Sequence, residues 1–141
     1  MLVVVDANTV FSALLTKGRT FDAFLANNLF KRFEFIAPEF LFFELGKHFD
    51  EIVVRSKLSD EERDKVFRFI KGEIDFTPFE EFNRYADEAD EIAPHAKDVH
   101  YFALALSFHA AIWSNEKAFK KQSVVKVFST KDLISVLFSA P

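Results

Sequence analysis

Four acidic side chains stand where a metal-dependent reaction could use them: Asp6, Glu44, Asp98 and Glu116. Carboxylates that are brought together repel one another, and they stay ionised together only when a cation lies among them. Oxygen ligands without His or Cys suit Mg²⁺ or Mn²⁺, and these ions support phosphoryl transfer. If the fold gathers the four acids, it creates a centre for that chemistry.

Short apolar runs alternate with helical segments along the chain. The runs that favour strands are residues 2–5, 33–37, 74–77, 111–114 and 124–129. Helices are expected over residues 20–30, 39–55, 78–92, 98–109 and 131–138, with a further one after a Ser59–Glu62 capping box. Thr20 and Thr130 are the expected caps of the first and last of these. Strands alternating with helices indicate an α/β fold of three layers around a mainly parallel sheet.

This arrangement predicts where the acids lie. In right-handed βαβ units each helix runs antiparallel to the strands, so strand C-termini and helix N-termini share one edge of the sheet. Asp6 follows the first strand, and Glu116 follows the fourth by two residues. Glu44 lies early in the helix after the second strand, and Asp98 opens the helix before the fourth. All four acids are therefore expected at the edge where α/β sheets bind ligands.

Taken singly, most of these acids have ordinary explanations. An Asp after a strand, such as Asp6, is often a turn or capping residue, and Asp98 could be a plain helix N-cap. Glu116 lies in a polar stretch that reads as an exposed turn. Glu44 is different because it lies in the apolar stretch 40–45 and should have a partner there. The hypothesis of a metal centre therefore depends on the convergence of all four.

Length and composition set the broad class. The chain has 141 residues, half of them hydrophobic, which suits a single domain over 1–141. It has no Cys, and no apolar run approaches the roughly 20 residues needed to span a bilayer. Met1 runs directly into an apolar strand without the cationic start of a signal peptide. We expect a cytoplasmic protein with no membrane association. The net charge of −4 argues mildly against a broad basic surface for nucleic acid.

Four segments of this chain resemble the PIN-domain family, which includes the VapC-type toxins of toxin–antitoxin pairs. They are residues 3–8 (VVVDAN), 37–45 (APEFLFFEL), 97–106 (KDVHYFALAL) and 111–119 (AIWSNEKAF). Each carries one of the four acids, in the order that the family has them. Asn8 occupies a position where the family usually has a polar residue, and Ser114 one where it has Ser or Thr.

The resemblance implies a five-stranded parallel sheet of order 3-2-1-4-5 and endonucleolytic cleavage of RNA that depends on Mg²⁺ or Mn²⁺. Water would attack phosphorus, and the 3′ oxygen would leave. Asp6 and Asp98 would be the principal metal ligands, with Glu116 completing the site. Glu44 would hold the attacking water or take its proton. Asn8 and Ser114 would support the ligands by hydrogen bonds.

The sequence departs from the family pattern at two places. Glu116 stands where the family usually has Asp, and His95 lies where relatives often carry an additional acid. The longer Glu side chain could misplace a ligand around Mg²⁺, which demands near-ideal octahedral geometry, whereas Mn²⁺ tolerates less regular ligation. We therefore expect Mn²⁺ to support more activity than Mg²⁺.

Other functions stay open at this point. The stretch from Asp6 to Thr9 is similar to the Asp-x-Asp-x-Thr motif of haloacid-dehalogenase-type phosphatases, but Asn8 replaces their general acid. A PIN-like domain that binds RNA or a protein without cutting is a second alternative. Glu44 and His48, four residues apart on one helix, could instead form a pair of ligands for a transition metal.

Partners are only partly indicated. Two basic groups could meet RNA phosphate, or could simply be solvated: Lys17 with Arg19, and Lys117 with Lys120 and Lys121. An antitoxin protein is a possible partner under the toxin interpretation. The helix over 39–55 carries more apolar surface than one buried stripe requires, in the form of Phe40, Phe42, Phe43 and Phe49. This pattern predicts a homodimer that buries some of these rings.

Overall fold

A five-stranded parallel sheet forms the centre of the structure, a computed structural model that describes residues 1–139. The strands are β1 (Leu2–Val5), β2 (Glu34–Pro38), β3 (Ile74–Thr77), β4 (Ala111–Trp113) and β5 (Val127–Phe128). Their order is β3-β2-β1-β4-β5, and all four pairings are parallel. The predicted fold class and strand order are therefore confirmed. β1 lies in the middle of the sheet, and its apolar residues Val3, Val4 and Val5 are all fully buried, as expected for a strand covered on both faces.

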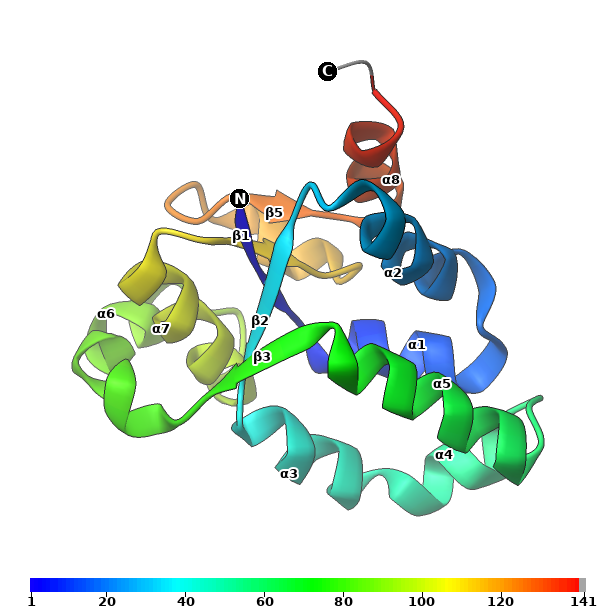
Figure 1. Cartoon of the computed structure of the whole chain (residues 1–141). Helices are drawn as coiled ribbons and strands as arrows, with labels where there is room; N and C mark the ends of the chain where they lie inside the picture. Colours follow the sequence, from blue (N-terminus) through cyan, green and yellow to red (C-terminus); the bar gives the residue numbers. More distant parts are fainter. Residues whose placement is uncertain (140–141) are drawn as a thin grey trace.

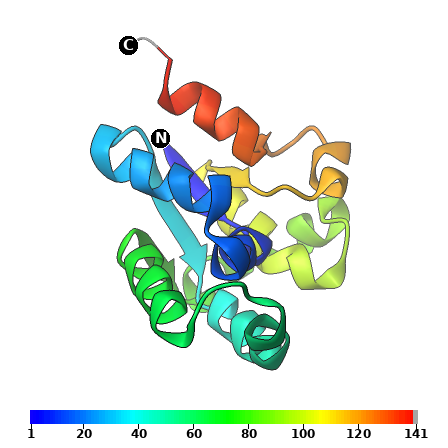
Figure 2. The ribbon, with the colours of Figure 1, turned by 90° about the vertical axis from the view of Figure 1, so that its right-hand side faces the viewer.

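Helices cover both faces of the sheet (Figure 1). They are α1 (Ala7–Thr16), α2 (Gly18–Phe30), α3 (Phe40–Lys47), α4 (Phe49–Arg55), α5 (Asp60–Gly72), α6 (Ala86–Ile92), α7 (Val99–Phe108) and α8 (Thr130–Leu137). Short 3₁₀ turns are η1 (Phe79–Glu81), η2 (Asn83–Tyr85), η3 (Ala96–Asp98) and η4 (Lys117–Lys121). α6 and α7 lie on one face, and α1, α2, α5 and α8 lie on the other (Figure 2). Within residues 1–139, no helix has the length and apolar character to cross a membrane.

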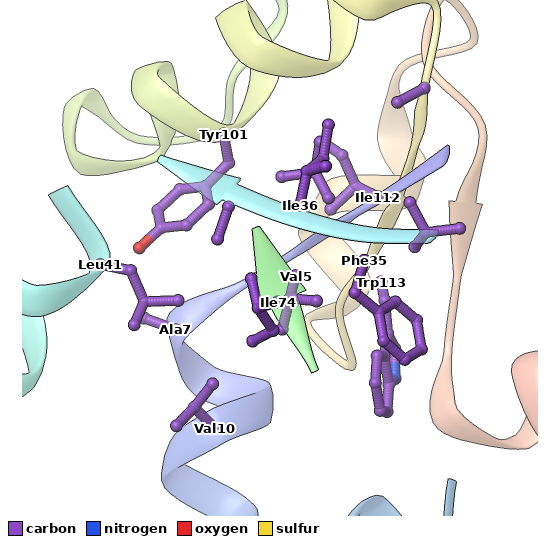
Figure 3. Close-up of a cluster of buried hydrophobic side chains, with 14 of the residues drawn as sticks. Val5, Ala7, Val10, Phe35, Ile36, Leu41, Ile74, Tyr101, Ile112 and Trp113 are labelled. Atoms are coloured by element: carbon purple, nitrogen blue, oxygen red, sulfur yellow. The ribbon is translucent and has the colours of Figure 1, made fainter. Parts of the chain in front are cut away.

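Large aromatic side chains fill the space between the sheet and the helices. The Phe24 ring of α2 packs against Phe35 of β2 and Trp113 of β4, with centroids 5.4 and 4.7 Å apart. Figure 3 shows Phe35 beside Trp113, with Tyr101 of α7 elsewhere in the core. This packing holds β1 and β4 in a register that pairs Val5 with Trp113. The residues that follow these two strands are therefore brought next to each other.

Two of the predicted helices are broken. The segment over 39–55 divides into α3 and α4 at His48, where φ is −106° and ψ is 13°. Gly46 lies just before the break, and glycine weakens a helix interior. The segment over 78–92 is α-helical only from Ala86 and forms two short 3₁₀ turns before it, because the chain bends at Phe82 to bury that ring completely. In the segment over 78–92, burial of Phe82 in the core therefore outweighs the helical pattern of the sequence.

Two of the predicted helix caps were wrong, and one was confirmed. Ser129, rather than Thr130, caps α8 through a reciprocal capping box with Asp132. The Thr130 hydroxyl instead accepts a hydrogen bond from the buried Trp113 indole at 3.0 Å. α2 begins at Gly18 (φ +55°) rather than at Thr20, since a positive φ that glycine adopts freely lets the chain reverse within a short turn. The capping box at the start of α5 is present as predicted.

Candidate active site

The four predicted acids all lie at the C-terminal edge of the sheet. Asp6 follows β1, and its backbone N–H donates to the carbonyl of Trp113 at 3.1 Å, which continues the β1–β4 pairing. Glu116 follows β4, Glu44 lies in the second turn of α3, and Asp98 ends η3 directly before α7. The sheet is thus what brings together side chains from four distant parts of the sequence.

Ser114 links two of these acids. Its hydroxyl donates to Asp6 Oδ2 at 2.8 Å and accepts from the backbone N–H of Glu116 at 3.1 Å. The side-chain amide of Asn8 donates to the Glu116 carboxylate from the other side. Asn8 and Ser114 therefore each donate a hydrogen bond to one of the four acids, Asn8 to Glu116 and Ser114 to Asp6.

Tyr101 is a partner of Glu44 that the sequence did not indicate. The Tyr101 side chain is fully buried, and its hydroxyl donates to a Glu44 carboxylate oxygen. Burial, together with the charge of Glu44, raises the pKa of Tyr101, so this hydroxyl remains a donor. A signal was present: Tyr101 lies three residues after Asp98, and a buried Tyr hydroxyl usually needs a partner. Only the three-dimensional structure identifies that partner as Glu44.

Asp98 does not act as an ordinary helix cap. It occupies the N-cap position of α7, yet its side chain makes no capping hydrogen bond. The residue is only 3% exposed, and within residues 1–139 its Oδ2 has no hydrogen-bond partner. A buried carboxylate oxygen without a partner is costly, and its presence needs an explanation. A bound cation would satisfy it.

Burial and mutual repulsion raise the pKa values of the two buried acids. The pKa of Asp6 rises from an ordinary 3.8 to about 7, chiefly through burial and further through the charges of Glu116, Asp98 and Glu44, while the Ser114 hydrogen bond opposes the rise. The pKa of Asp98 rises to about 6, again through burial first and then the charge of Glu116. Asp6 and Asp98 are therefore close enough to Glu44 and Glu116 to be affected by their charges, and a divalent cation among the acids would relieve the repulsion.

The donor set fits a hard divalent cation, but the acids do not already form a cage around one. In the described part of the chain, no three His, Cys, Asp or Glu side chains are arranged as a metal site. Three of the four carboxylates bond instead to neutral donors, namely Ser114, Asn8 and Tyr101. The four acids supply only oxygen ligands, as Mg²⁺ and Mn²⁺ prefer, and the unpartnered oxygen of Asp98 is available.

Comparison with known proteins agrees with this geometry. The family model of the PIN domain matches residues 4–136. The chain belongs to the PIN-domain family. A solved structure of VapBC2 from Rickettsia felis, bound to a DNA fragment from their promoter, has a chain with the same PIN fold. The TM-score is 0.66 at 16% sequence identity, and the match covers 92% of this chain and 98% of that one. No curated protein matches the sequence.

The structure also shows where the other residues that the sequence singled out lie in this PIN domain. The stretch from Asp6 to Thr9 opens the PIN domain, so it is not a phosphatase motif. His48 does not pair with Glu44; its Nδ1 lies 3.4 Å from Glu51 instead. His95 lies near Asp98, and the charges of Lys97 and His95 act to lower the pKa of that acid against the rise caused by burial.

The two basic groups found in the sequence are partly engaged with surface acids of the PIN domain. The Lys17 ammonium lies 3.6 Å from Glu62, and the Lys120 ammonium lies 2.6 Å from Asp132. Lys97 is a further cation near the acids that the sequence pattern did not single out. It directly precedes Asp98 and acts on the charge of that carboxylate.

Proposed function

We propose that this PIN domain is a metal-dependent endoribonuclease whose acidic centre holds Mg²⁺ or Mn²⁺. The observation that carries the proposal is Asp98: a buried carboxylate with an unpartnered oxygen, beside a second buried acid whose pKa is also raised. Acids strained in this way are typical of functional sites. PIN domains generally depend on divalent metal, which supports the same conclusion.

Each residue then has a role in hydrolysis of an RNA phosphodiester. Asp6, Asp98 and Glu116 would hold the cation, which when bound neutralises phosphate charge and favours attack by water. Ser114 and Asn8 orient Asp6 and Glu116 through their hydrogen bonds. Glu44 is partly exposed and is held by Tyr101 at one carboxylate oxygen. Its other oxygen can accept a proton from the water that attacks phosphorus as the bond to the 3′ oxygen breaks.

Cleavage and metal binding should be tested on the same protein. The parent should cut single-stranded RNA with Mn²⁺, less with Mg²⁺ and not with chelator. Asp98→Asn should lose Mn²⁺ binding by calorimetry and lose cleavage, while Asp22→Asn, which removes an exposed acid of α2, should keep both. If Asp98→Asn binds Mn²⁺ and cuts like the parent, the proposed centre is wrong.

A domain that binds RNA or protein without cutting is the second candidate. The absence of a ready metal cage within residues 1–139 and the Glu at position 116 favour it. A parent that binds RNA but shows neither Mn²⁺ binding nor cleavage would establish this alternative.

We also propose two protein partners. An antitoxin is supported by the shared fold with a chain of the VapBC2 structure, and a protein encoded beside this chain should co-purify with it and block cleavage. A second copy of this chain is supported by Phe43 and Phe49, which are 64% and 56% exposed, whereas Phe40 and Phe42 are half-buried. Light scattering at tens of micromolar should give a dimer, and a monomer would count against it.

A further inference from the structure

We propose that a polar pocket beside the acidic centre binds one unpaired nucleotide of the RNA substrate, next to the phosphate that is cut. This inference rests on the proposed function and specifies its substrate as single-stranded. The pocket lies between α1 and α4, has a volume of about 390 Å³, and is lined by residues of both helices together with Lys97. That volume lies within the range of about 300–1,000 Å³ that is usual for small-ligand sites.

The pocket adjoins the acidic centre through two of its lining residues. Asn8 lines it and also donates to the Glu116 carboxylate. Lys97 lines it and is the residue directly before Asp98, whose pKa it lowers by its charge. An RNA strand with one phosphate among the four acids would therefore place a neighbouring nucleotide at this pocket.

The walls of the pocket suit a nucleobase. The rings of Phe11 and His48 meet edge to face, with centroids 5.4 Å apart and planes at 79°. Leu15 and the buried Ile52 add apolar surface, while Ser12 adds a hydroxyl. Aromatic and apolar walls accept the flat face of any base, and the polar groups can meet its edge. A base inside a duplex has both faces covered by its neighbours, so only an unpaired base can enter.

One cation of the pocket, Lys97, can meet a phosphate group. Glu51 lies 2.8 Å from Arg55 and 3.4 Å from His48 Nδ1, and these contacts lower the pKa of Glu51. The ionised Glu51 thus holds both side chains in place and offsets the charge of Arg55. Lys97 makes no ion pair within residues 1–139, so its charge remains available for a phosphate. An RNA nucleotide supplies both the flat base and the anion that the pocket would match.

Binding of RNA without cleavage tests the pocket independently of catalysis. Fluorescence anisotropy of a short labelled single-stranded RNA would be followed in chelator with the full chain. Phe11→Leu keeps apolar volume but removes the ring, and it should weaken binding about tenfold. Lys97→Met should weaken it a few-fold and reduce the slope of log affinity against log salt by about 0.7. Duplex RNA should bind more weakly and should not respond to Phe11→Leu.

Matched controls remove a ring and a charge elsewhere. Phe138→Leu changes a 64% exposed ring beyond the end of α8, and Lys126→Met changes a lysine before β5 at the opposite edge of the sheet. Both should bind RNA like the parent. Lys97 is exposed, so Lys97→Met should fold even if Phe11→Leu is unstable.

The outcomes separate this inference from the proposed function. If Phe11→Leu and Lys97→Met bind RNA like the parent, the pocket does not hold a nucleotide. A peptide partner would then be the alternative occupant. If both bind weakly but the parent cuts no RNA with Mn²⁺, the pocket is supported and the nuclease proposal fails. A parent that binds no single-stranded RNA in chelator overturns the pocket, whereas the nuclease proposal is decided by cleavage with Mn²⁺.

Discussion

The acids at the C-terminal edge of the sheet differ sharply from the acids at the helix starts on the surface. Burial and like charges raise the pKa of Asp6 to about 7 and that of Asp98 to about 6. On the surface, Lys120 and the capping hydrogen bonds with Ser129 lower the pKa of Asp132 to about 2. Hydrogen bonds with Ser59 likewise lower the pKa of Glu62.

The acids that stabilise the fold are therefore different from the acids of the candidate site. The surface acids sit in capping boxes, where folding favours their ionised form. Asp6 and Asp98 also occupy N-cap positions, of α1 and α7, but neither side chain caps its helix. Their carboxylates are thus placed at a cost to the stability of the metal-free protein. Strongly shifted pKa values without a structural benefit are a mark of a functional site.

The largest effect should come from removing the charge of Asp6. Asp6→Asn keeps the size of the side chain and its contact with Ser114, but it removes the charge of a residue that we propose as a metal ligand. We expect Mn²⁺-dependent RNA cleavage to fall by about 100-fold or more, as for a group essential to the reaction. Initial rates on a labelled RNA would measure this, with Asp132→Asn as a control that changes a surface acid. Parental cleavage by a folded Asp6→Asn protein would remove Asp6 from the site.

The same substitution should stabilise the metal-free protein at high pH. Because the folded pKa of Asp6 lies near 7, above the ordinary 3.8, the folded state holds a proton that the unfolded state releases between these values. The free energy of unfolding of the parent should therefore fall as pH rises through this window. The free energy of unfolding of Asp6→Asn should exceed that of the parent by roughly 2–4 kcal/mol at about pH 8. At about pH 4 the two free energies should be nearly equal.

Urea unfolding in chelator at both pH values would measure this difference. Added Mn²⁺ should stabilise the parent and leave Asp6→Asn nearly unchanged. If the free energy of unfolding depended on pH equally in parent and variant, the pKa of Asp6 would not be raised in the folded protein.

Removing the surface acid Asp132 should have the opposite effect, because it should lower the stability of the protein. Asp132→Ala removes the capping box of α8 and the contact with Lys120, so it should cost about 1 kcal/mol of stability at neutral pH. Solvent screens the exposed ion pair, so most of the loss should come from the cap. Because the folded pKa of Asp132 is lowered to about 2, its contribution should disappear as pH falls from about 4 towards 2. Thermal unfolding would measure the loss, and cleavage of RNA should be unaffected.

The smallest effect should be the exchange of Glu116 for the Asp that the family usually carries. Glu116→Asp should fold, cut RNA at least as well as the parent, and narrow the preference for Mn²⁺ over Mg²⁺ to within a few-fold, because the shorter side chain suits octahedral Mg²⁺. Glu116→Gln should bind both ions more weakly. Titration of each ion in the cleavage assay would decide. If Glu116→Gln matched the parent, the centre would consist of Asp6, Glu44 and Asp98 alone.

Much of the framework could be predicted because it depends on local pattern. The apolar run after Met1 and the run from Ile74 predicted the bounds of β1 and β3 correctly. Parallel strands share one edge, so the location of the four acids followed from their place after strands or at helix starts. The capping box of Ser59 and Glu62 was equally local.

Only the tertiary structure decided which side chains meet. Nothing in the sequence around Glu44 indicates Tyr101, which is 57 residues away and donates to it from another helix. The His48 ring at the break between α3 and α4 meets the Phe11 ring of α1, and this contact also exists only because the helices pack together. Periodicity and spacing determine helices, strands and the edge where they end, because those depend on neighbours along the chain. Hydrogen-bond partners, pocket walls and pKa values depend on neighbours in space, which exist only once the sheet has assembled.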